Sequence, residues 1–179
     1  MIGGVAKRYA RALEAIGLER GNLDEILAQT ERLAGAWAAA EDLRHVLENP
    51  LFPIEKRREI LRSVADGMGI GEVVRNAALL LLDRSRLPEL GRIALALRSM
   101  ADDRAGRIRA EVVSAVELSE AYYDRLGAAL ETITGRKVIL ARRQDPSLIA
   151  GVVTRVGDRL YDGSARTRLA EIREALVEK

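Results

Sequence analysis

Apolar side chains recur every three or four positions through residues 1–105, which is the period of an amphipathic helix. Prolines and glycines separate the successive stripes, because the residue before a proline avoids helical angles and glycine weakens a helix. The first stripe consists of Val5, Tyr9, Ala12, Leu13 and Ile16. The pattern predicts six helices: 5–20, 23–39, a short one around 43–47, one from 53 to the glycines at 67, 69 and 71, 72–84, and one that starts near 88.

The helix predicted at 72–84 differs from the others because it has little polar face. Its apolar residues include Val73, Val74, Ala77, Ala78 and the four leucines at 79–82. A helix that is apolar nearly all round is buried on most of its sides. We therefore expect this helix either to be central in the bundle or to be partly covered by a partner.

The period changes after Gly106, where apolar and polar residues alternate as in a strand with one wet face. We predict strands at 108–112, 137–141, 149–156 and 159–162. Between the first two strands, Ser119 is expected to cap a helix. The side of this helix that we expect to face inward consists of Tyr122, Leu126, Leu130 and Ile133. The expected fold is mainly α: an N-terminal six-helix bundle (1–105) and a smaller C-terminal α/β domain (106–179) with a short mixed sheet.

The segment 145–176 contains residues whose types are explained by backbone geometry. Asp145-Pro146-Ser147 suits a turn, although Asp145 could instead contact a partner, and Gly157-Asp158 suits a two-residue hairpin. Ser164 precedes an apolar helical pattern, so we interpret it as a helix cap and not as a nucleophile beside Asp162. We assign structural roles to Pro146, Gly151, Gly157, Asp158, Asp162, Gly163 and Ser164.

Composition excludes several kinds of chemistry. The chain has no cysteine, so disulfides, thiolate zinc sites and cysteine nucleophiles are absent. His45 is the single histidine and lies among charges, which favours a solvated surface role over a catalytic relay. The glycines from 67 to 71 fall between two predicted helices, so we interpret them as an interhelical loop and not as a phosphate loop. We expect no cofactor, no metal and no enzyme activity.

Charge and hydropathy limit the possible partners. Acidic and basic residues nearly cancel to a net charge of +2, and aromatic residues make up only 3% of the chain. Neither a basic field nor a stacking platform for nucleic acid is therefore expected. No apolar run is long enough to span a bilayer, and the N-terminus lacks a signal-peptide core. We expect an intracellular protein that meets a membrane only through a partner.

Two surfaces are candidates for binding. The helices at 5–20 and 72–84 could line a groove that accepts a third helix, or the same residues could be ordinary bundle core. The residues of this candidate groove are Tyr9, Ala12, Leu13, Ile16, Val74, Ala77, Ala78 and Leu81. The second surface is a basic group that is either a solvated face or a rim for an acidic partner, formed by Arg155, Arg159, Arg166 and Arg168.

Several segments, taken together, resemble the delta subunit of F-type ATP synthases and its mitochondrial homologue, the oligomycin-sensitivity-conferring protein. The opening helix Arg8-Tyr9-Ala10-Arg11-Ala12-Leu13 is similar to that of the family, as are Arg75-Asn76 through Leu82. The most specific match runs from Asp145 to Leu169, with Asp-Pro-Ser-Leu-Ile, Gly-Val-Val, Arg-Val-Gly-Asp and Asp-Gly-Ser in order. Glu14 and Gly17 depart from the usual phenylalanine and alanine of the family.

This resemblance implies a non-catalytic stator subunit at the cytoplasmic face of a bacterial plasma membrane. The bundle would hold the N-terminal helix of an alpha subunit in the candidate groove, and the C-terminal domain would hold the C-terminal end of the b subunits. The protein would thus couple proton-driven rotation to ATP synthesis. Two alternative functions are an arginine-rich helical adaptor for nucleic acid and a small hydrolase that uses Ser164 or Ser147. Balanced charge argues against the first, and the single histidine argues against the second.

Overall fold

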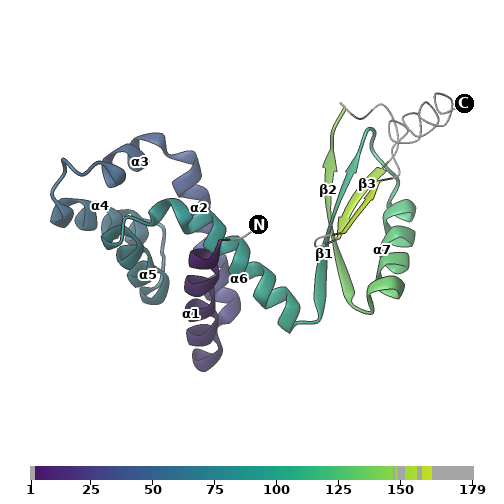
Figure 1. The fold of residues 1–179 in the computed structure, drawn as a ribbon, viewed down its shortest axis with the longest axis horizontal. Helices are drawn as coiled ribbons and strands as arrows, with labels where there is room; N and C mark the ends of the chain where they lie inside the picture. The colour runs from purple at the N-terminus through teal and green to yellow at the C-terminus, as the bar shows by residue number, and fades with distance from the viewer. Residues whose placement is uncertain (1–2, 147, 149–151, 157–158, 163–179) are drawn as a thin grey trace, which may run out of the picture. The chain divides into compact units, whose positions relative to one another are not determined.

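The computed structural model describes residues 3–146, 148 and 152–156, and the backbone of 159–162. All six helices predicted for the N-terminal part are present (Figure 1). They are followed by a sheet with one further helix. The N-terminal elements are α1 (Gly4–Arg20), α2 (Leu23–Ala39), α3 (Glu41–Glu48), α4 (Ile54–Gly67), α5 (Glu72–Asp83), the 3₁₀ turn η1 (Leu87–Glu89) and α6 (Leu90–Arg104).

The helix boundaries follow from turn residues. Gly21 closes α1 with a left-handed φ of 66°, a conformation that glycine adopts without a steric cost. Asn49 follows α3 in extended conformation, as expected before Pro50, and its Oδ1 accepts a hydrogen bond from the Leu51 N–H at 2.9 Å. Gly67 ends α4, and the residues from 68 to 71 form the interhelical loop that the sequence predicts, with Gly69 at a φ of 64°.

The core of the bundle includes Trp37, Leu61, Ile93 and Leu97, all of which are buried. On α1 the buried stripe shares only Leu13 with the predicted one. It consists of Ala6, Ala10, Leu13 and Gly17, whereas Val5, Tyr9 and Ile16 are only half-buried and Ala12 is exposed. Small side chains let α1 approach the bundle closely, so the larger residues beside them lie at its margin.

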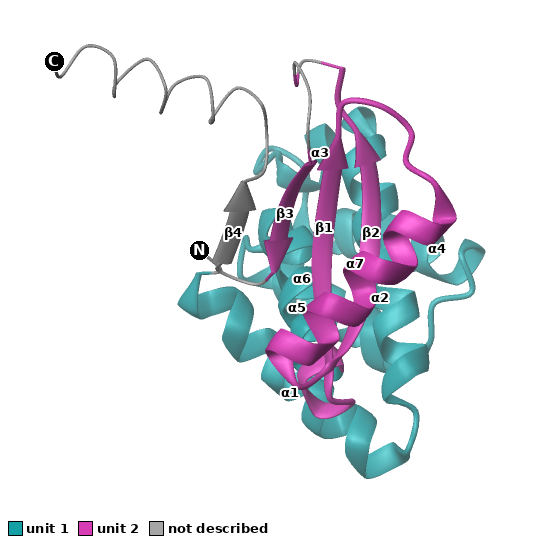
Figure 2. Cartoon of the chain, turned by 90° about the vertical axis from the view of Figure 1, so that its right-hand side faces the viewer, with its two compact units in different colours: residues 1–101 teal, residues 102–179 magenta. Residues whose placement is uncertain are grey.

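The C-terminal part is a four-stranded mixed sheet, covered on one face by α7 (Glu120–Thr134) (Figure 2). The strand order is β2-β1-β3-β4, with β1 parallel to β2 and the other two pairings antiparallel. A small core of Ala110, Leu130 and Val156 lies between α7 and the sheet. The strands are β1 (Arg107–Ser114), β2 (Lys137–Gln144), β3 (Val152–Val156) and β4 (Arg159–Asp162).

The inward side of α7 was predicted only in part. Leu130 is buried and Leu126 packs against the same core, but Tyr123 is buried in place of Tyr122, and Ile133 is 62% exposed. Tyr123 lies beneath Arg142 of β2, whose Cζ is 4.0 Å from the ring centroid. Ser119 stands at the N-cap position, but its side chain makes no capping hydrogen bond.

The predicted turns of the last segment lie partly outside the described residues, but residues that flank them are described. Leu148 N–H donates a hydrogen bond to the Asp145 carbonyl at 3.1 Å. Val156 pairs with Arg159 in antiparallel strands, which is the spacing expected on either side of a two-residue hairpin. Asp162 ends β4. The remaining residues with predicted structural roles lie outside the described residues: Gly151, Gly157, Asp158, Gly163 and Ser164.

The chain divides into two compact units, residues 1–101 and 102–179, four residues earlier than predicted (Figure 2). The last turn of α6 belongs to the second unit, and its acidic side chains bind arginines of that unit. The carboxylate of Asp102, a buried residue, accepts a hydrogen bond from Arg109 Nε at 2.6 Å, and Asp103 pairs with Arg136 at 2.8 Å. Among the described residues, no helix is both long enough and apolar enough to cross a bilayer.

Candidate partner-binding groove

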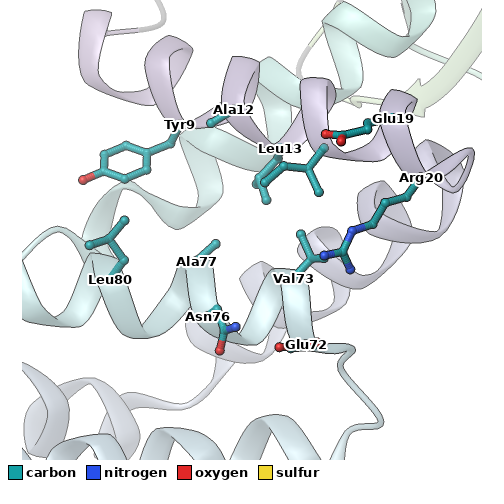
Figure 3. Close-up of a pocket in the computed structure, with 11 residues that line it drawn as sticks. Tyr9, Ala12, Leu13, Glu19, Arg20, Glu72, Val73, Asn76, Ala77 and Leu80 are labelled. Carbon is teal, nitrogen blue, oxygen red and sulfur yellow. The ribbon is translucent and has the colours of Figure 1, made fainter.

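A groove of about 400 Å³ lies between α1 and α5, both of which belong to the N-terminal unit (Figure 3). Each wall is formed by one side of a helix, because residues three, four and seven positions apart lie on the same side of a helix. The lining residues are Tyr9, Ala12, Leu13, Ile16, Glu19 and Arg20 from α1, and Glu72, Val73, Asn76, Ala77 and Leu80 from α5.

The groove is a partly uncovered apolar surface. Leu80 is 45% exposed, Ala12 is exposed, and Tyr9, Ile16, Val73 and Ala77 are half-buried. The expectation that α5 is either central or covered by a partner is thus resolved in part. One face of the helix is buried in the bundle, and the face toward α1 is open.

Five of the eight predicted groove residues line it: Tyr9, Ala12, Leu13, Ile16 and Ala77. The other three do not, because Val74, Ala78 and Leu81 are at most 2% exposed and belong to the bundle core. Leu13 does both, since it lines the groove although it is buried. One side of α5 therefore lines the groove, and the other side belongs to the bundle core.

Sequence reasoning missed the remaining lining residues, which are mostly polar. Glu19, Arg20, Glu72 and Asn76 do not belong to an apolar stripe, so a search for apolar periodicity passes over them. Val73 and Leu80 were missed for another reason: on a helix with little polar face, periodicity alone does not indicate which apolar residue faces outward. Val73, Ala77 and Leu80 are four and three residues apart, and this spacing places them on one side of α5.

The two ends of the groove differ in polarity (Figure 3). Tyr9 and Leu80 lie at one end, and Glu19, Arg20 and Glu72 gather at the other. None of these three charged side chains takes part in a hydrogen bond or ion pair within the described part of the chain. Two of these positions suit the helix dipoles, because Glu72 is in the first turn of α5 and Arg20 is in the last turn of α1, whereas the acidic Glu19 is also in the last turn of α1 and does not benefit in this way.

The C-terminal unit has a second cleft, of about 350 Å³, on the sheet. Arg143 lies there between two carboxylates, with Nε 3.6 Å from Glu111 and Nη2 3.8 Å from Asp145. Arg155 faces Glu111 across the β1–β3 pair and is exposed. The lining residues are Glu111, Val113, Arg143, Asp145, Leu148, Val153 and Arg155.

Of the predicted basic group only Arg155 has a described side chain. The side chain of Arg159 and all of Arg166 and Arg168 lie outside the described residues. Arg143, which the sequence analysis did not select, is the second arginine of this cleft. Its place follows from register, because Val113 pairs with Arg143 on one side and Val153 on the other.

In the described segments, no three histidine, cysteine, aspartate or glutamate side chains gather as metal ligands would. His45 is on the surface with its side chain 77% exposed, 3.6 Å from Glu41. Both surfaces combine apolar area with a few charged groups, which is typical of protein–protein contacts.

Comparison with known proteins identifies the family. The family model described as the ATP synthase delta (OSCP) subunit matches residues 5–176. The chain belongs to this family. The "ATP synthase subunit delta" of Geotalea uraniireducens is 40% identical over 172 residues, covering 96% of each chain. That of Myxococcus xanthus is 41% identical over 177 residues, covering 98% of this chain and 97% of its own.

A solved structure supports the fold of this delta-family chain. A chain of the Toxoplasma gondii mitochondrial ATP synthase hexamer superposes with a TM-score of 0.73 at 19% identity, covering 98% of both chains. As a delta-family member, the chain is a component of the stator, or peripheral stalk, of F-type ATP synthase. Delta is a non-catalytic subunit of that complex. It is a peripheral, membrane-associated part of the complex.

Proposed function

We propose that the groove between α1 and α5 binds the N-terminal helix of the synthase's alpha subunit and so attaches the chain to the catalytic head. The observation that carries this proposal is the apolar strip left open along two neighbouring helices, with Leu80 45% exposed in its wall. A contiguous exposed apolar surface on a folded unit favours an interaction site. The occupant that suits a long groove between two helices is an amphipathic helix.

The shape of the groove supports a helical occupant. Ala12 and Ala77 are small residues on opposite walls, so the backbone of a third helix can approach closely. Tyr9, Ile16 and Leu80 supply larger apolar contacts, and an aromatic anchor of this kind contributes strongly to binding. A joint of nanomolar strength corresponds to about −12 kcal/mol, a magnitude that buried apolar contacts of this type can supply.

We also propose that the C-terminal unit binds the C-terminal end of the stalk's b subunit. Arg155 is exposed and lies beside the apolar Val153 on β3 and Val113 on β1. An arginine at the edge of apolar area suits a partner that brings both apolar and carboxylate groups. The terminal carboxylate at the end of a chain is such a group. Arg159, Arg166 and Arg168 are included in this proposed surface on the basis of the sequence only.

Together the two surfaces form a passive link between the head and the stalk. A link that resists torque needs two binding surfaces on stiff elements and no active site. By holding the head still while the rotor turns, the chain couples proton-driven rotation to ATP synthesis. We place it at the cytoplasmic face of a bacterial plasma membrane, with membrane contact only through the complex. Bacterial relatives support this location.

Nucleic-acid binding, the alternative considered from the sequence, gains no support from the comparisons. The matching family model and the curated relatives are ATP synthase subunits. The net charge of +2 is also too small for a charge-driven nucleic-acid site.

Titration of the full chain with a peptide that copies the alpha-subunit N-terminus tests the groove. Ala12→Trp places a large ring in the groove, whereas Ala15→Trp places the same ring on an exposed part of α1 that does not line it. We expect Ala12→Trp to weaken binding by about tenfold or more, equivalent to at least about 1.4 kcal/mol, and Ala15→Trp to leave it unchanged. Equal affinity for the two variants would move the alpha site away from the groove.

A further inference from the structure

The two walls of the groove both rest on α2. On the α5 side, the Gly71 N–H donates a hydrogen bond to Gln29 Oε1 of α2 at 2.8 Å. Gln29 is only 8% exposed, and its Nε2 donates to Glu25 Oε1 at 2.9 Å. Because a carboxylate only accepts hydrogen bonds, Glu25 fixes the orientation of the amide and turns its oxygen toward Gly71.

This hydrogen bond acts on the first turn of α5. The N–H groups at the start of a helix have no partner within the helix, and Gly71 is the N-cap of α5. The next two residues, Glu72 and Val73, line the groove (Figure 3). Gln29 therefore ties the polar end of one groove wall to α2.

Gly71 also packs closely on Gln29. A Cβ built on Gly71 would stand 2.9 Å from Oε1 at the end of the Gln29 side chain, which would have to shift to make room. On the opposite wall, a Cβ built on Gly17 would stand 2.9 Å from the Leu23 Cα. Each wall thus has one glycine pressed against α2, and the groove lies between the two walls.

We infer that Gln29 is a positioning residue that sets the separation of the groove walls, although it does not line the groove itself. Its hydrogen bond holds the start of α5 at one distance from α2, and α1 is held on α2 through Gly17 and Leu23. The affinity of the groove for a helix then depends on a buried carboxamide behind the wall. This inference rests on the proposed function of the groove.

The test compares Gln29→Met, which keeps the length of the side chain but removes the amide, with the swapped pair Glu25→Gln/Gln29→Glu. In the swapped pair a carboxylate at 29 still accepts from Gly71, and an amide at 25 still donates to position 29. Leu47→Ala is the control, since Leu47 is 1% exposed on α3 and does not line the groove. The chain has no cysteine, so Ala15→Cys on α1 and Arg84→Cys at the C-cap of α5 can carry spin labels at exposed positions outside the groove lining.

Two quantities are measured: the distance distribution between the labels, and the affinity for the alpha N-terminal peptide. We expect Gln29→Met to shift or broaden the distance and to weaken binding about fivefold, within the range for one lost hydrogen bond. The swapped pair should restore both quantities. Leu47→Ala should lower stability and change neither.

Other outcomes overturn the inference or separate it from the proposed function. Unchanged distance and affinity in Gln29→Met would overturn it, and so would a loss of affinity that the swapped pair does not restore or that Leu47→Ala reproduces. If the unmodified chain does not bind the peptide, the proposed function fails, and the label distance still decides whether Gln29 spaces the walls.

Discussion

Gly17 of α1 lies so close to Leu23 of α2 that a Cβ on residue 17 would stand 2.9 Å from the Leu23 Cα. From the sequence alone, Gly17 differs from the alanine that is usual in the family and is expected to weaken the helix. The structure gives it a positive role, because only a residue without a side chain permits this approach.

We predict that Gly17→Ala destabilises the N-terminal unit by about 1–3 kcal/mol, the cost of overpacking, despite the higher helix propensity of alanine. Gly35→Ala is the matched control, since Gly35 is exposed on α2 and nothing lies within 4 Å of its built Cβ. That change should stabilise by about 0.5–1 kcal/mol. Trp37, the single tryptophan, is buried in this unit and reports its denaturant unfolding by fluorescence. Equal effects of the two changes would contradict the close approach.

A second prediction concerns neighbouring leucines of α5. Leu80 is 45% exposed in the groove wall, and Leu81 is 2% exposed in the core. Leu81→Ala should cost about 2–5 kcal/mol of stability, whereas Leu80→Ala should change it by no more than about 0.5 kcal/mol. In titrations with the alpha N-terminal peptide, Leu80→Ala should nevertheless weaken binding. Intact binding by this variant would remove Leu80 from the contact.

A third prediction concerns pH. Arg58 of α4 donates from Nε to Asp83 Oδ1 of α5 at 2.8 Å, and this hydrogen bond holds the pKa of Asp83 below its ordinary value. A carboxylate with a lowered pKa stabilises the folded state above its unfolded pKa, about 3.9, and this stability is lost as the pH falls through the folded pKa.

Arg58→Met should therefore lower the free energy of unfolding near neutral pH, and the deficit should shrink as the pH falls below about 3.9. Lys56→Met is the control, because the Lys56–Glu59 pair is two-thirds exposed, and exposed pairs contribute little. Denaturant titrations at a series of pH values measure the difference. A deficit that is the same at every pH would show that Arg58 acts by packing alone.

A fourth prediction concerns the joint between α7 and β2. Arg142 donates from Nη2 to Glu120 Oε2 at 2.7 Å and lies over the Tyr123 ring, and the pKa of Glu120 is lowered mainly by this hydrogen bond. Lysine cannot combine a two-donor fork with stacking, so Arg142→Lys should loosen the joint. We expect faster amide exchange in α7 and β2 and unchanged exchange in the N-terminal unit. Unchanged exchange in α7 would show that the pair is only a surface contact.

Much of the fold was predictable because helix periods, turn residues and strand alternation are local signals. All six bundle helices and four strands lie close to the positions expected from the sequence. What periodicity could not supply is the rotation of a helix about its axis. Tyr122 and Tyr123 are both suitable for burial, and only the structure shows that Tyr123 is buried beneath Arg142 whereas Tyr122 is half-buried.

The groove shows the same limit. Apolar spacing selected the two correct helices, but it did not separate the lining residue Ala77 from its buried neighbour Ala78. The charged end, with Glu19, Arg20 and Glu72, was missed because polar residues carry no periodic signal. The role of Gln29 depends on a hydrogen bond between residues 42 positions apart, which no local pattern can predict.

The most direct test of the central claim mixes the full chain with a purified alpha-containing catalytic head and a C-terminal fragment of the b subunit, and measures the assemblies by mass. We predict one complex that contains all three. Ala12→Trp should remove the head and retain the b fragment, and Arg155→Glu should do the reverse. Failure of the unmodified chain to bind either component, or binding of the two in competition for one surface, would contradict a link with two separate ends.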